Sequence, residues 1–117
     1  MFDALKNLGN LPGLMARARE MQEKMKTLQD ELAKRQVTAD SGGGMVTAIV
    51  NGKLELVKLR IEKARLPDPN DFEMLEDLIT AAVAAAQNKA GEMIKDEMSK
   101  LAGDLGLPPG MLPPSGL

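Results

Sequence analysis

Six basic side chains between positions 17 and 35 are the residues whose chemistry is easiest to name: Arg17, Arg19, Lys24, Lys26, Lys34 and Arg35. Lysine and arginine neutralise the phosphates of a DNA backbone without reading its bases. A plainer interpretation stays open, because three acid–base pairs in this segment have the i,i+4 spacing of a solvated helix face: Glu20–Lys24, Asp30–Lys34 and Glu31–Arg35. The segment therefore predicts either a phosphate-binding ridge or a solvent-exposed helix.

A second, smaller basic set lies near the middle of the chain. Lys58 and Arg60 share one face of a predicted strand, and Lys53, Lys63 and Arg65 flank them. Charged residues on a strand usually mark a solvent-exposed face rather than a binding face. Lys58 and Arg60 are therefore only secondary candidates for contacts with DNA.

Two other motifs have the residue types of a site but lack its context. The carboxylates at 71, 73, 76 and 77 could hold magnesium or act as acid and base, but helix N-termini collect carboxylates for electrostatic reasons alone. The Gly42–Gly44 run could cradle a phosphate, yet neither a Lys-Ser/Thr pair nor a helix follows it. We expect a helix start and a turn, respectively.

The chain contains no histidine and no cysteine, and its aromatic residues are Phe2 and Phe72. These absences exclude Ser-His and Cys-His nucleophilic systems, disulfides, and the usual zinc, haem and iron–sulfur sites. Two phenylalanines cannot supply a base-stacking platform for single strands. The sequence therefore predicts a protein that is not an enzyme, with no cofactor, no metal and no small-molecule substrate.

The net charge of −2 hides an asymmetry along the chain. Residues 1–66 carry a net charge of +4, and residues 67–117 carry −6. No segment approaches the ~20 apolar residues of a membrane span, and no signal-peptide pattern opens the chain. We expect a cytoplasmic protein with no membrane partner.

The basic residues lie on a predicted long helix at about 12–35. Its apolar residues are spaced alternately three and four apart, as in a heptad seam: Leu11, Leu14, Ala18, Met21, Met25, Leu28 and Leu32. At 1.5 Å per residue this helix would be roughly 36 Å long, which is more than the core of a small domain needs.

Three strands are predicted to follow, at about 36–40, 45–50 and 53–62. The glycine run separates the first two, and Asn51-Gly52 predicts a two-residue hairpin between the second and third. Such a turn would place Val50 opposite Lys53, Thr47 opposite Leu56 and Val46 opposite Val57. In the third strand, Val57, Leu59 and Ile61 would share one face and Lys58 and Arg60 the other.

A second long helix is predicted from about Asn70 to Leu101. Asn70 and Glu73 have the spacing of a capping box. The apolar stripe of this helix contains Leu75, Ile79, Ala82, Ala86, Ala90 and Met93. From Gly103 the composition, rich in glycine and proline, predicts a flexible tail.

These elements predict an α+β fold: an α-β-β-β-α subunit with a three-stranded antiparallel meander and two long helices. Residues 1–102 would form a single domain and residues 103–117 a flexible Gly/Pro-rich tail. Three short strands cannot cover two such long helices, so the remaining apolar surface predicts a homodimer.

Four motifs, in order, resemble the YbaB/EbfC family of bacterial nucleoid-associated proteins: LMARAREMQEKM at 14–25, SGGGMV at 41–46, NG at 51–52 and EMLEDLITAA at 73–82. The resemblance implies a small homodimer of α-β-β-β-α subunits that binds duplex DNA in the cytoplasm and associates with the nucleoid. It attributes DNA contacts mainly to the projecting helices, which here matches Arg17, Arg19 and Lys24. Lys26, Lys34 and Arg35 extend that surface on electrostatic grounds.

The chain departs from this picture in being net acidic, with nine acidic residues after position 66. We therefore expect the helix at about 12–35, rather than the helix from about Asn70 to Leu101, to contact DNA, and we expect binding to depend strongly on salt. A different class of function stays open: a dimeric helical adaptor for partner proteins, with incidental DNA binding.

Overall fold

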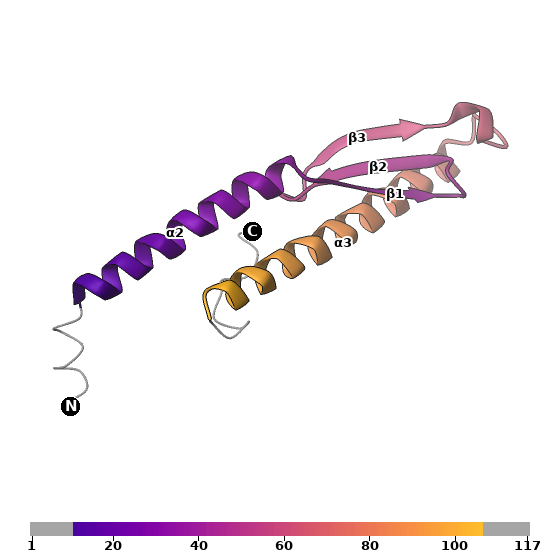
Figure 1. Ribbon diagram of the computed structural model, residues 1–117. Coiled ribbons are helices and arrows are strands. Elements are labelled where there is room, and N and C mark those ends of the chain that lie inside the picture. The colour runs from indigo at the N-terminus through magenta and orange to yellow at the C-terminus, as the bar shows by residue number, and fades with distance from the viewer. Residues whose placement is uncertain (1–10, 107–117) are drawn as a thin grey trace.

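The computed structural model describes residues 11–106, which form two long helices and one antiparallel sheet (Figure 1). The elements, in chain order, are α2 (Leu11–Lys34), β1 (Gln36–Ser41), β2 (Val46–Asn51), β3 (Leu56–Ile61), the short 3₁₀ helix η1 (Lys63–Arg65) and α3 (Phe72–Asp104). This order confirms the predicted α+β fold with an α-β-β-β-α subunit and a three-stranded meander.

Helix α2 has the predicted length, and its cover increases from an exposed N-terminal half to its C-terminal end. Leu32 is 4% exposed, whereas Leu11 and Leu14 at the other end of the seam are 49% and 48% exposed. The Leu32 carbonyl accepts hydrogen bonds from the backbone N–H groups of Arg35 (3.1 Å) and Gly52 (2.9 Å). The helix is therefore joined to the sheet at its C-terminal end. Along its apolar seam, Met21, Met25 and Leu28 are half-buried, whereas Leu11, Leu14 and Ala18 are exposed.

The sheet has the order β1-β2-β3, with β2 in the centre. The predicted turn between β1 and β2 is confirmed, because Gly42, Gly43 and Gly44 all have positive φ, a conformation that glycine adopts without strain. This turn brings Ser41 opposite Val46. It also lets the Ser41 hydroxyl donate to the carbonyl of Leu78 in α3 (2.6 Å).

The predicted register between β2 and β3 is wrong. Val46 pairs with Ile61 and Ala48 with Leu59, and the register shifts between Ile49 and Val50. The connection is longer than two residues because the Asn51 side chain organises it: Oδ1 accepts from the backbone N–H groups of Lys53 and Glu55. Val46, Thr47 and Val50 therefore lie opposite residues later in β3 than a two-residue turn would give.

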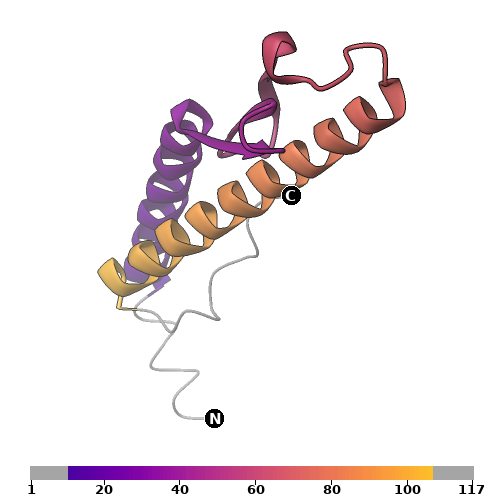
Figure 2. The ribbon, with the colours of Figure 1, turned by 90° about the vertical axis from the view of Figure 1, so that its right-hand side faces the viewer.

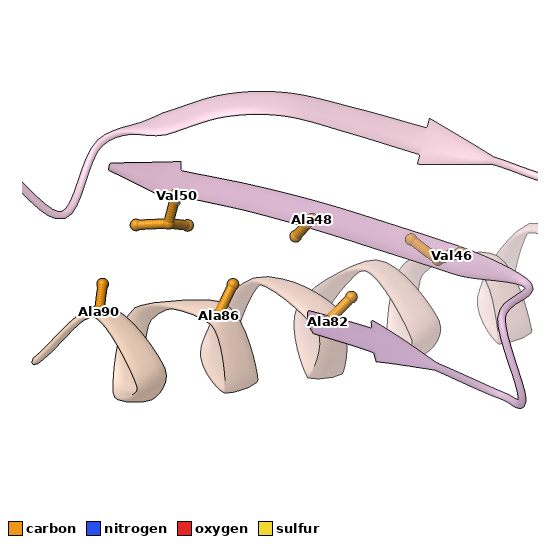
Figure 3. Packing of buried hydrophobic residues seen from close by; sticks show 6 residues of the cluster. All are labelled: Val46, Ala48, Val50, Ala82, Ala86 and Ala90. Atoms are coloured by element: carbon orange, nitrogen blue, oxygen red, sulfur yellow. The ribbon is translucent and has the colours of Figure 1, made fainter. Parts of the chain in front are cut away.

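The core lies between β2 and α3, and Figure 3 shows its two rows of side chains facing each other. Val46, Ala48 and Val50 meet Ala82, Ala86 and Ala90, and all six are fully buried. Alanine at these positions lets the helix lie close beneath the sheet. The predicted apolar stripe of the second helix is confirmed from Leu75 to Ala90, with Leu75 and Ile79 packed around this cluster. At the end of the stripe, Ile94 is buried and Met93 only half-buried.

Helix α3 packs against β1 and β2 and leaves β3 largely uncovered. Leu59 packs against the core, but Leu56, Val57 and Ile61 remain 47%, 48% and 40% exposed. We call these three residues the β3 patch.

The N-cap of α3 is Asp71, so the predicted capping box at Asn70 and Glu73 is wrong by one residue. The Asp71 carboxylate accepts from the backbone N–H of Met74 (3.1 Å), whereas the backbone N–H of Asn70 donates to Asp68. The helix ends at Asp104, a little beyond the predicted Leu101. Apart from its first four positions, the predicted tail at 103–117 lies outside the described residues.

The molecule is elongated, with principal extents of 73 × 23 × 18 Å. In Figures 1 and 2, α2 and the C-terminal half of α3 extend beyond the sheet on the same side and run antiparallel. None of the helices within residues 11–106 is both long and apolar enough to span a membrane.

Candidate nucleic-acid interface

Helix α2 projects from the sheet as an arm, and the N-terminal part of this arm is exposed throughout (Figure 1). Every residue from Leu11 to Glu20 is exposed, including Arg17 and Arg19. At 100° per residue, Arg17 and Lys24 lie beside the apolar seam, and Arg19 and Lys26 lie on the face nearly opposite it. The arm therefore presents two basic rows, one beside its apolar seam and one on its far face.

The structure divides the six cations predicted for α2 into paired and unpaired groups. Lys24 forms an ion pair with Glu20 (3.2 Å), and Arg35 forms one with Glu97 of α3 (2.8 Å). Arg17, Arg19, Lys26 and Lys34 are exposed and make no ion pair with another residue of the range 11–106. Of the three helix pairs expected from spacing, Glu20–Lys24 is present at ion-pair distance among the described residues.

Between α2 and α3 lies an open groove of about 490 Å³. It is lined by Glu23, Lys24, Thr27, Leu28 and Glu31 of α2 and by Glu97, Lys100, Leu101 and Asp104 of α3. Both basic and acidic side chains line it. It gives a phosphate backbone no uniformly positive surface, so the exposed cations of the arm outside the groove are the better candidate for DNA contacts.

Glu97 makes a contact with the end of α2 that the sequence did not predict. Its side chain is 16% exposed and accepts hydrogen bonds from Arg35 and, at 3.3 Å, from Lys100. The hydrogen bond from Arg35, aided by that from Lys100, lowers the pKa of the Glu97 carboxyl below its usual value, although burial opposes the shift. Spacing could not reveal this contact because its partners are 62 positions apart.

The secondary candidates, Lys58 and Arg60, are both exposed on β3. Arg60 lies opposite Thr47, which lies opposite Asp40, so this row across the sheet contains an acid as well as a base. Near the same end of the sheet, Arg65 donates to the carbonyl of Gly43 (3.2 Å). The sheet therefore offers a weaker basic surface than the arm.

The carboxylates at the start of α3 occupy the positions expected of a helix N-terminus. Asp71 caps the helix and Glu73 lies in its first turn. Within residues 11–106, no three histidine, cysteine or acidic side chains are grouped so that they could hold a metal ion.

Comparison with known proteins gives one consistent family. The model of the YbaB/EbfC DNA-binding family matches residues 7–105. A nucleoid-associated protein of Thermoanaerobacter sp. (strain X514) is 46% identical over 99 residues, which are 85% of this chain and 88% of that one. Another, from Paramagnetospirillum magneticum, is 47% identical over 106 residues, which are 91% and 95% of the two chains.

A solved structure has the same fold. The crystal structure of an uncharacterized protein from Helicobacter pylori superposes with a TM-score of 0.70 at 26% identity. The match covers 80% of this chain and 97% of that one. The similarity in sequence and in fold therefore extends over nearly all of the described residues.

Proposed function

The chain belongs to the YbaB/EbfC DNA-binding family, and from this premise we propose that it binds duplex DNA as a homodimer, mainly through phosphate contacts. Its function is then non-enzymatic: it associates with the bacterial nucleoid in the cytoplasm and serves nucleoid organisation or gene regulation. The curated relatives carry the name nucleoid-associated protein, which supports this location.

The observation that carries the proposal is the exposed basic arm in a chain that belongs to a DNA-binding family. Arg17, Arg19, Lys26 and Lys34 have no ion-pair partner among the described residues, so their charge is available to phosphates. Lys24 and Arg35 already have carboxylate partners and contribute less directly. Lys58 and Arg60 remain secondary contacts in this proposal.

The exposed apolar side chains support the homodimer. The β3 patch and the arm residues Leu11, Leu14 and Met15 are all between 40% and 52% exposed, and burying them stabilises a complex. A second protomer also doubles the number of basic arms. A protein with a net charge of −2 per chain can thereby present a locally positive surface to DNA.

Light scattering after size exclusion tests the dimer. We expect twice the chain mass of 12.6 kDa at micromolar concentration. Val57→Asp, which places a charge in the β3 patch, should favour the monomer, whereas Thr38→Asp on the exposed side of β1 should not. A clean monomer for the wild-type protein would overturn this part of the proposal.

Fluorescence anisotropy with a labelled duplex tests DNA binding. We expect binding at 50 mM salt that weakens steeply by 200 mM, because each neutralised phosphate contributes about −0.9 to the slope of log K against log salt. Absence of binding at 50 mM salt, or an affinity that does not change with salt concentration, would reject the proposal. Either result would favour the adaptor alternative, in which partner proteins occupy the exposed apolar surfaces.

A further inference from the structure

The junction between α2 and β1 is held to α3 by one ion pair. Arg35 lies between the last residue of α2 and the first residue of β1. Its guanidinium donates to Glu97 Oε1 at 2.8 Å, and Lys100 approaches the same oxygen at 3.3 Å. Each of the other two ion pairs of the described chain joins residues of one helix, the first within α2 and the second within α3. The Arg35–Glu97 pair is thus the described ion pair that connects the arm to α3.

We propose that Glu97 is a positioning residue for DNA binding: by holding Arg35, it fixes the angle at which the basic arm of α2 leaves the sheet. This inference rests on the proposed function and adds to it a residue that does not itself touch DNA. Glu97 is suited to the role because its side chain is mostly buried, while those of Arg35 and Lys100 are 48% and 73% exposed.

The packing around the pair supports the arm chiefly near its base. On the sheet side, Leu32 is buried and its carbonyl bonds to the N–H of Gly52. Met21, Met25 and Leu28 are half-buried, but an open groove lies between α2 and α3, and α2 is exposed from Leu11 to Glu20. The Arg35–Glu97 pair adds a directed contact to α3 at the base of the arm, where a small rotation changes the direction of the whole helix.

The length of the arm magnifies any change at its base. Arg17 lies 18 positions before Arg35, a distance of roughly 27 Å along a helix. A rotation of about 10° at the junction would move Arg17 by about 5 Å, which exceeds the ~3.4 Å rise between successive phosphates of one strand. The basic rows meet a phosphate backbone in register only when the junction is held.

The direction in which one substitution changes the affinity for DNA separates this role from simple electrostatics. Glu97→Gln removes a negative charge and leaves the charge of Arg35 uncompensated, so charge alone predicts tighter binding to DNA. Loss of positioning predicts weaker binding, by about two- to fivefold given the usual strength of a single exposed ion pair. The matched control is the neighbouring Asp96→Asn, which removes the same charge from an exposed residue that forms no ion pair within residues 11–106.

The experiment measures duplex affinity of the full chain by anisotropy and arm geometry by spin-label distances. The chain has no cysteine, so Gln22→Cys and Ser99→Cys, both at exposed positions, give specific label sites on α2 and α3. Refolding the labelled chain with an excess of unlabelled chain gives dimers in which one protomer carries both labels, so the measured distances are those within a single protomer. We expect Glu97→Gln to bind DNA more weakly than Asp96→Asn and to broaden the α2–α3 distance distribution.

Two results would overturn the inference. One is an affinity of Glu97→Gln equal to or tighter than that of Asp96→Asn; the other is a distance distribution that Glu97→Gln does not change. If the wild-type protein binds no duplex at all, the proposed function fails, but the distance measurement still decides whether Glu97 holds the arm.

Discussion

At the scale of single residues, the turn after β2 shows where sequence patterns were insufficient. Asn51-Gly52 is a hairpin signal, and a connection does begin there. Its length is set by the Asn51 side chain, which accepts hydrogen bonds from two backbone N–H groups, and by Gly52, whose N–H donates to the carbonyl of Leu32. The second of these contacts depends on where α2 ends in space, so local sequence could not reveal it.

Gly52→Ala is expected to destabilise the protein by about 2 kcal/mol or more. A Cβ at this position would collide with the carbonyl oxygen of Leu32, a backbone atom that cannot move aside without loss of the attachment of α2. Gly91→Ala is the control, because a Cβ there meets nothing within 4 Å and alanine favours the helix by about 0.5–1 kcal/mol. Urea denaturation measures both; equal effects of the two substitutions would contradict the assigned contact.

The contribution of Glu97 to stability should depend on pH. Its pKa is lowered in the folded state, mainly by the hydrogen bond from Arg35, so its stabilising effect is present above the unfolded value of about 4.3. This effect is lost as the pH falls through the lower folded value. The difference in Tm between wild type and Glu97→Gln should therefore be largest near neutrality and shrink below about pH 4. A difference that stays constant down to pH 3 would be inconsistent with the ion pair.

At the scale of elements, periodicity predicted both helices, the order of the strands and the alanine stripe that packs beneath the sheet. It did not predict that α3 would leave β3 uncovered. Alternation placed Val57, Leu59 and Ile61 on one face, but burial depends on where the helix crosses the sheet. Helix α3 packs against β1 and β2, so Leu59 reaches the core while Val57 and Ile61 stay about half exposed.

The close approach of α3 and β2 gives a prediction for the alanine stripe. Ala86 is fully buried against the sheet, so Ala86→Leu should destabilise the protein by about 1–3 kcal/mol through overpacking. Ala84, two residues earlier, is exposed, and Ala84→Leu should change stability by less than about 0.5 kcal/mol. Thermal denaturation of the two variants tests this, and similar losses for both would contradict the packing at the core.

At the scale of the whole molecule, the basic and acidic halves of the sequence form different parts of the structure. The basic first half supplies the projecting arm, and the acidic second half supplies α3. The seam of α2 indicated that the helix is too long for its own core, and its free end is indeed exposed. The pair of Arg35 with Glu97, by contrast, depends on the completed fold, so no local pattern could indicate it.

The central claim is that DNA binds to the arm of α2, and one comparison of two triple variants tests it most directly. Arg17→Gln/Arg19→Gln/Lys26→Gln neutralises three exposed cations of the arm, and Lys53→Gln/Lys63→Gln/Lys95→Gln neutralises three exposed cations elsewhere. Net charge changes equally in both. Anisotropy titrations of a duplex between 50 and 200 mM salt should show at least about tenfold weaker binding for the arm variant, with the salt slope reduced by about 0.9 for each lost contact. The other variant should stay within about threefold of the wild type, and an equal loss of affinity in the two variants would contradict the account.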